Sequence, residues 1–169
     1  MNETQGSPFW RFSLGFYRQP GVADACIRLQ EEAGVDVNLL MFLLWHATQA
    51  QCLTPAEVAE LDRRTSPWRE QAVIPLRRVR RALKTPPPLV EPATAELFRT
   101  RIKAVELEAE RLQQEAMYDL VRSALLGRAA ASAAEAARTN VAAYQAIAPV
   151  AFPSPAVDIL LAALAKMVG

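Results

Sequence analysis

The segment 76–84 carries the most distinctive charges of the chain. Its cations recur at spacings of three and four residues, so a helix would place them on one face: Arg77, Arg80, Arg81 and Lys84. The leucine and valine residues between them fall on another face. Because a guanidinium presents a planar fork of N–H donors that suits oxyanions, this basic face could bind an acidic protein, a phosphate or RNA.

Internal pairing is the alternative for the same cations. Glu106, Glu108 and Glu110 follow on a long expected helix and are candidate ion-pair partners, Glu106 and Glu110 above all. No aromatic residue interleaves the arginines, as single-stranded nucleic-acid binding would favour. The formal net charge is only +1. We therefore expect a protein partner and not nucleic acid.

Glu106 and Glu110 stand one helical turn apart, and paired carboxylates can hold a divalent metal or share acid–base work. Exposed helices commonly carry such residues, however, and Lys103 and Arg111 are close enough in sequence to balance them. No Asp-rich repeat supports a diphosphate–magnesium site. We expect no catalytic residues, no metal site and no cofactor.

His46 is the only histidine, so a site with several histidine ligands is excluded. It follows Trp45 in an apolar segment, where we expect a buried, hydrogen-bonded residue. Cys26 and Cys52 lie in apolar surroundings without metal-type spacing, and we expect both to be free thiols that pack as small apolar groups. Nucleophilic catalysis with His46 would need a geometry that the sequence does not reveal.

The composition is that of a globular protein, since 51% of the 169 residues are hydrophobic and 22% are charged. The N-terminus lacks the basic and apolar regions of a secretory signal. The strongest apolar run, residues 39–45, is far shorter than the roughly 20 residues that span a bilayer. These features predict a cytoplasmic protein without a membrane span.

Hydroxyl residues followed by proline mark several helix starts, because the hydroxyl caps the first turn and proline suits its first position. Together with the Ser132 capping box, they predict helices that begin near residues 8, 55, 67, 133 and 155. Pro75 should kink or split the helix that contains it. A long helix is expected over residues 93–126, and no segment shows the alternation typical of strands.

The segment 37–51 has no polar face over two turns, which is typical of a buried central helix. We predict an all-α fold, a single irregular or orthogonal bundle of about seven or eight helices around this segment. One domain is expected over residues 1–169. The Pro-rich turn at 85–92 would separate two sub-bundles.

The chain also resembles a small proteobacterial family of about this length that is catalogued as a domain of unknown function. The resemblance covers most of the chain and is most specific over residues 9–45, in the segments 9–14, 20–22 and 36–45. Further matches are at 68–69, 76–77, 80–84, 106–107 and 109–110. It implies a bacterial cytosolic protein but no reaction, and it transfers no catalytic residue.

Our leading functional hypothesis is a non-enzymatic helical module that binds another protein through the basic face. A carrier or sensor of an apolar small molecule or lipid is a second possibility, because helical bundles can hold such ligands between their helices. A metal-assisted enzyme using Glu106 and Glu110 is the third. The sequence leaves the oligomeric state open.

Overall fold

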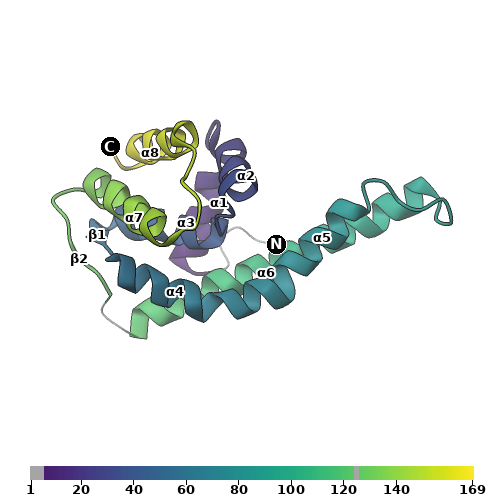
Figure 1. Cartoon of the computed structure of the whole chain (residues 1–169), viewed down its shortest axis with the longest axis horizontal. Helices are drawn as coiled ribbons and strands as arrows, with labels where there is room; N and C mark the ends of the chain where they lie inside the picture. The colour runs from purple at the N-terminus through teal and green to yellow at the C-terminus, as the bar shows by residue number, and fades with distance from the viewer. Residues whose placement is uncertain (1–5, 124–125) are drawn as a thin grey trace. The chain divides into compact units, whose positions relative to one another are not determined.

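The computed structural model describes residues 6–123 and 126–169, and its secondary structure is predominantly helical. The helices are α1 (Pro8–Tyr17), α2 (Val22–Ala33), α3 (Val37–Thr48), α4 (Pro55–Trp68), the π-helical turn η1 (Arg69–Val73), α5 (Ile74–Ala82), α6 (Pro92–Ser123), α7 (Ala133–Ile147) and α8 (Ser154–Val168). Two short strands, β1 (Gln51–Cys52) and β2 (Arg128–Ala129), complete the fold (Figure 1). The expected all-α class is confirmed. Among the described helices, none has the length and apolar character needed to cross a membrane.

The chain forms two compact units. Unit 1 consists of residues 1–62 and 114–169, and unit 2 consists of residues 63–113. The helices α4 and α6 therefore each contribute residues to both units. The Pro-rich turn at 85–92 does not separate the units, because it lies inside unit 2 between α5 and α6.

Most of the predicted helix starts coincide with observed capping bonds. The Ser7 hydroxyl accepts the Trp10 N–H at 3.0 Å, and the Ser132 hydroxyl accepts the Glu135 N–H at 3.1 Å. Thr54 and Glu57 form a reciprocal capping box at the start of α4. At α8 the helix begins at Ser154 itself and has no side-chain cap, so the expected role of this serine is wrong.

The helix α3 is the buried centre of unit 1. Every residue from 39 to 44 is at most 2% exposed. The helices α7 and α1 pack against it, and Phe9 of α1 meets Phe42 edge-on at 5.3 Å between ring centroids. On another side Trp45 contacts Tyr118 of α6 at 5.6 Å. This confirms the central helix that its uniformly apolar sequence predicts.

The predicted end of that helix, at residue 51, is wrong. The helix α3 ends at Thr48, Ala50 takes a left-handed φ of 50°, and β1 pairs antiparallel with β2. Asn140 of α7 stabilises this departure, because its amide donates to the carbonyls of Leu43 and Gln51 and accepts the Leu53 N–H. The expectation of no strands also fails here, since a two-residue ladder is too short to show an alternating pattern.

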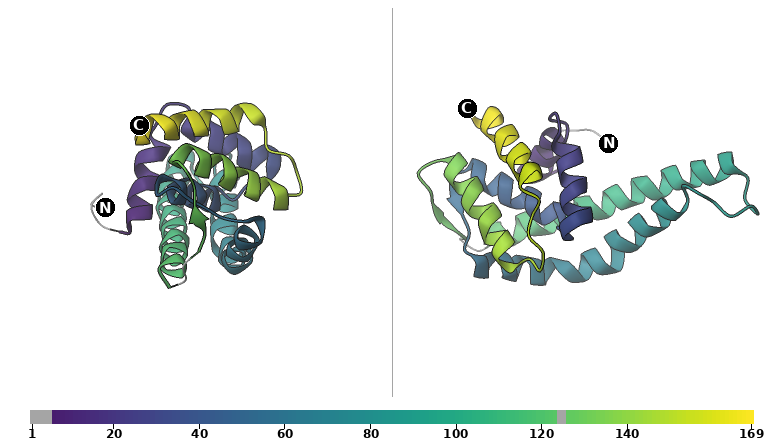
Figure 2. Two further views of the ribbon diagram at one scale, coloured as in Figure 1. Left: turned by 90° about the vertical axis from the view of Figure 1, so that its left-hand side faces the viewer. Right: turned by 45° about the horizontal axis from the view of Figure 1, so that its top comes forward.

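In unit 2, α5 and α6 run side by side and are joined by the loop 83–91 (Figures 1 and 2). The chain does not split at Pro75: α4, η1 and α5 follow one another without a gap, and the π-helical turn η1 ends at Val73, two residues before this proline. A helix start near 67 is wrong, because α4 continues through Pro67. Pro67 cannot donate to the Arg63 carbonyl, and the Ser66 hydroxyl donates to that carbonyl at 3.4 Å instead.

Replacing Asn140 with Ala should destabilise unit 1 by about 3 kcal/mol, because it leaves three buried backbone groups without their partner. Urea unfolding followed by circular dichroism would measure the change. Gln145→Ala, an exposed position on the same helix, is the matched control and should change the free energy of unfolding by less than about 0.5 kcal/mol. Equal effects of the two substitutions would contradict the role assigned to Asn140.

Candidate functional site

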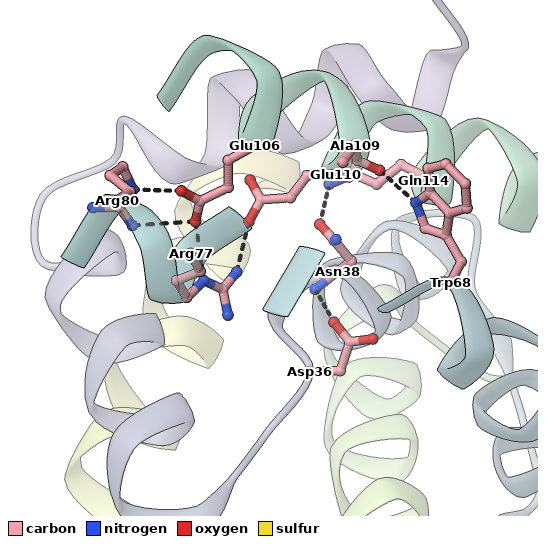
Figure 3. Close-up of polar contacts among 9 residues, drawn as sticks. All are labelled: Asp36, Asn38, Trp68, Arg77, Arg80, Glu106, Ala109, Glu110 and Gln114. Carbon is pink, nitrogen blue, oxygen red and sulfur yellow. Dashed lines mark hydrogen bonds and ion pairs between the residues drawn. The ribbon is translucent and has the colours of Figure 1, made fainter. Parts of the chain in front are cut away.

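The predicted basic face meets the predicted carboxylates inside unit 2. Arg77 Nε donates to Glu106 Oε1 at 3.1 Å, and Arg77 Nη2 donates to Glu110 Oε1 at 2.7 Å. Arg80 grips both oxygens of Glu106, with Nη2 at 3.1 Å from Oε1 and Nε bonded to Oε2. Figure 3 shows the two guanidinium groups facing the two carboxylates. Pairing of these arginines within the chain is thus what the geometry shows.

Burial and charge act in opposite directions on Glu106. Its side chain is only 6% exposed, and this desolvation alone would raise the pKa of the carboxyl group. The hydrogen bonds from Arg80 and Arg77 outweigh burial and hold the pKa of Glu106 below its usual value of 4.5. The same contact raises the pKa of Arg80. Glu106 therefore remains ionised at neutral pH and binds two cations at once.

The side of α5 that faces α6 is mixed in character. No residue of α5 is buried, but Leu76 is half-buried together with Arg77 and Arg80, while Val79 is 43% exposed. Trp68 adds a further polar link, because its indole N–H donates to the Ala109 carbonyl at 2.9 Å. Polar contacts thus contribute to the hairpin formed by α5, the loop 83–91 and α6.

The other two predicted site residues, Arg81 and Lys84, lie at the surface of unit 2. Arg81 and Lys84 are exposed, as is Arg78, which the sequence-based prediction left out. The pattern could have identified Arg78, because residues 63–84 contain eight Lys or Arg residues and only one acidic residue, Glu70. This segment, which we call the basic arm, carries a formal charge of +7.

The charge of the chain is strongly segregated between its units. Unit 2 holds twelve Lys or Arg and six Asp or Glu residues, whereas unit 1 holds seven and twelve. The formal charges of +6 and −5 almost cancel, which is why the net charge of +1 conceals them. Unequal charge within one chain is typical of proteins that bind a charged partner.

The geometry does not favour a metal at Glu106 and Glu110. Two guanidinium groups already neutralise these carboxylates, so a divalent cation would have to displace them. Within residues 6–123 and 126–169, no group of three His, Cys, Asp or Glu side chains is placed to hold a metal ion.

His46 occupies a second polar position, in unit 1, and is only 4% exposed. Its burial is as expected, and the backbone of Leu126 is the polar group that interacts with its ring. Gly127, with a left-handed φ of 91°, approaches so closely that a Cβ there would lie 3.1 Å from His46 Nε2. The Gly127 N–H in turn donates to Glu57. The histidine is thus enclosed by neighbouring backbone.

A buried amide pair links two helices of unit 1. Gln114 Nε2 donates to Asn38 Oδ1 at 2.8 Å, while the Asn38 N–H donates to Asp36, the N-cap of α3 (Figure 3). Cys26 and Cys52 are both buried and free, as predicted. Burial raises the pKa of the Cys26 thiol to about 12, so this residue packs as an apolar group and does not supply a nucleophile.

Replacing Glu106 with Gln should weaken the hairpin by about 2 kcal/mol, because both arginines lose their charged acceptor. Hydrogen exchange of α5 amides in the full chain would report the loss as faster exchange. Glu108→Gln is the control, since the Glu108 side chain is 42% exposed and pairs only locally with Arg111. Because the folded-state pKa of Glu106 is lowered, the advantage of the native chain should shrink as pH falls below 4.5.

His46 should make the stability of unit 1 depend on pH near neutrality. Desolvation lowers its pKa from 6.5, against smaller opposing effects of the Leu126 backbone and the Glu57 carboxylate. The unfolded chain therefore takes up the proton first, and the free energy of unfolding should decrease as pH falls below about 6.5. His46→Gln should flatten this decrease in urea titrations between pH 7 and 5. An unchanged slope would assign the pH dependence to other groups.

Comparison with known proteins gives a family but no activity. The model of a family described as "Protein of unknown function (DUF2390)" matches residues 8–117, which include α1 to α5 and most of α6. No curated protein and no solved structure shows significant similarity to the chain. The match covers more than half of the sequence and includes the four residues that form the ion pairs between α5 and α6: Arg77, Arg80, Glu106 and Glu110. The chain therefore belongs to the DUF2390 family of proteins of unknown function.

Proposed function

We propose that this protein is a non-enzymatic interaction module that binds an acidic surface of another protein through the basic arm, residues 63–84. The proposal rests on the distribution of cations in the hairpin. Glu106 and Glu110 engage Arg77 and Arg80, but the arm exposes further cations: Arg63, Arg64, Arg78, Arg81 and Lys84. An arm with one acidic residue of its own creates a positive field that attracts and orients a negatively charged partner.

Exposed apolar side chains accompany these cations. Val79 is 43% exposed on α5, and Leu89 in the adjoining loop is 95% exposed. Exposed apolar groups next to arginine are characteristic of protein interfaces, which enrich both. Stacking aromatics, which a nucleic-acid groove would use, do not alternate with the arginines of residues 76–84. The mixture supports a protein partner.

In this proposal the protein acts in the bacterial cytoplasm. The two buried free thiols agree with a reducing compartment, where disulfides rarely persist. The carrier and metal-assisted alternatives have no comparable supporting observation.

Reversing the charges of Arg78, Arg81 and Lys84 to Glu should reduce capture of the partner at least about tenfold. These residues are chosen because Arg77 and Arg80 hold the hairpin together and their loss would confound the result. The measurement is quantitative mass spectrometry of proteins that co-purify with the tagged chain from its native host. Capture should also fall as salt is raised from 50 to 300 mM, because ions screen exposed charges.

The matched control reverses Arg11, Arg138 and Lys166, three exposed cations of unit 1, and so changes the net charge by the same amount. It should retain the partner. Loss of partners from both variants would show a general charge effect and contradict the proposal. Partner proteins that remain bound to the arm variant would contradict it equally, and nuclease-sensitive capture would replace it with a nucleic-acid role.

A further inference from the structure

A regular apolar ridge runs along α6 in unit 2. Phe98, Val105 and Leu112 are 50%, 52% and 44% exposed, although each is a large hydrophobic side chain. They are seven residues apart, and seven residues make almost two full turns of an α-helix, so all three share one line along its surface. The line is about 21 Å long at 1.5 Å per residue. We call these three residues the α6 ridge.

The ridge has the symmetry that self-association requires. Val105 lies midway between Phe98 and Leu112, seven residues from each. If two copies of α6 align antiparallel about Val105, Phe98 of each copy meets Leu112 of the other, and the two Val105 side chains meet at the centre. A two-fold interface needs such a patch, because the same surface must complement itself. The heptad spacing is also that of helices packed side by side.

The charges beside the ridge are complementary in the same alignment. Arg101 and Glu108 are also seven residues apart and lie on one flank of the ridge, at about 40° and about 60° from Val105 around the helix. The antiparallel rotation brings Arg101 of each copy beside Glu108 of the other, which gives two cross-pairs per dimer. In a parallel two-fold pair the two copies of this flank would lie on opposite sides of the interface, so Arg101 and Glu108 could not pair between the copies.

The other charges near Val105 lie on the far side of α6 from the ridge: Arg99, Lys103, Glu106 and Glu110. They do not enter the antiparallel contact. The α6 segment 91–113 has four cations and five anions, so the surplus positive charge of unit 2 belongs to the basic arm and does not oppose pairing through α6.

The ion pairs that α6 already forms within the chain leave the flank with Arg101 and Glu108 accessible to a second copy. Glu106 and Glu110 point toward Arg77 and Arg80, and Arg99 pairs with Glu96. Glu108 accepts two hydrogen bonds from Arg111 on the same helix, at 2.9 and 2.6 Å, and its side chain remains 42% exposed. A carboxylate has room for a second cation.

We propose that the chain forms a two-fold symmetric dimer in which the α6 ridges of two copies pack antiparallel, flanked by Arg101–Glu108 pairs between the copies. The partner at this surface is a second copy of the chain. The inference is independent of the proposed function, because it uses α6 and not the exposed cations of the basic arm.

Sedimentation velocity of the purified full chain, without any other protein, tests the dimer between about 1 and 100 µM. The native chain should sediment as a dimer at the upper end of this range. Val105→Glu should make it monomeric, and because Val105 is half exposed the helix should survive, as circular dichroism would show. Lys103→Glu, on the opposite side of α6 from the ridge, is the control and should leave the dimer intact.

A charge exchange then tests the alignment. Arg101→Glu alone and Glu108→Arg alone should each raise the dimer dissociation constant at least about tenfold, because each brings like charges together twice. The double variant restores opposite charges and should return to within about threefold of the native value. A net-charge effect does not explain weakening by both single variants, because Arg101→Glu lowers the net charge and Glu108→Arg raises it; rescue by the double variant then identifies the pair.

A native chain that is monomeric at 100 µM would overturn the proposal, as would a dimer that survives Val105→Glu or singles that the double variant does not rescue. A monomer that retains a different protein on the ridge would overturn it too. None of these results bears on the basic arm, whose binding is tested with the arm variants.

Discussion

The bridge that Glu106 forms between Arg77 and Arg80 determines the character of the hairpin. A single ionised carboxylate, almost fully enclosed, meets two guanidinium groups on α5, and one of them also reaches Glu110 a turn away. Such an arrangement orients the two helices, because the hydrogen bonds from two guanidinium groups to one carboxylate are directional. Apolar contacts alone lack this direction.

The hairpin has charged groups inside and apolar groups on its outer surface. Leu76 and Leu83 are half-buried beside the paired arginines. Other apolar groups are exposed on α5, in the loop and along α6. Its two helices differ in charge, one strongly basic and the other balanced. Separate surfaces for an acidic protein and for a second copy are compatible with this division.

Local sequence signals predicted local structure well. The caps at Ser7, Thr54 and Ser132 form as expected, each with a bond to a residue three positions away, whereas those expected at Ser66 and Ser154 do not. Non-local contacts were not predictable in the same way. The end of α3 depends on Asn140, which lies about ninety residues away in sequence, and the continuation of α4 through Pro67 depends on a hydroxyl that takes over a lost backbone bond.

The candidate site was partly predictable for the same reason. Spacing placed the arginines on one face and the glutamates a turn apart, and the structure brings Arg77, Arg80, Glu106 and Glu110 together. Spacing could not say which of the cations turn toward α6, because Arg77 and Arg80 are half-buried whereas Arg81 and Lys84 of the same predicted face are exposed. Charge segregation was hidden for another reason, since it depends on which residues share a compact unit.

The loop at residues 83–91 gives the hairpin one more property. The loop joins α5 to α6. The nearest residue of the ion pairs between these helices is Arg80 on α5, three residues before the loop, and Glu106 on α6, fifteen residues after it. Seven extra residues inserted in each helix between these pairs and the loop would add two turns to both and preserve the pairing of arginine with glutamate. The length of the hairpin can therefore change in steps of two helical turns while its ion pairs stay the same.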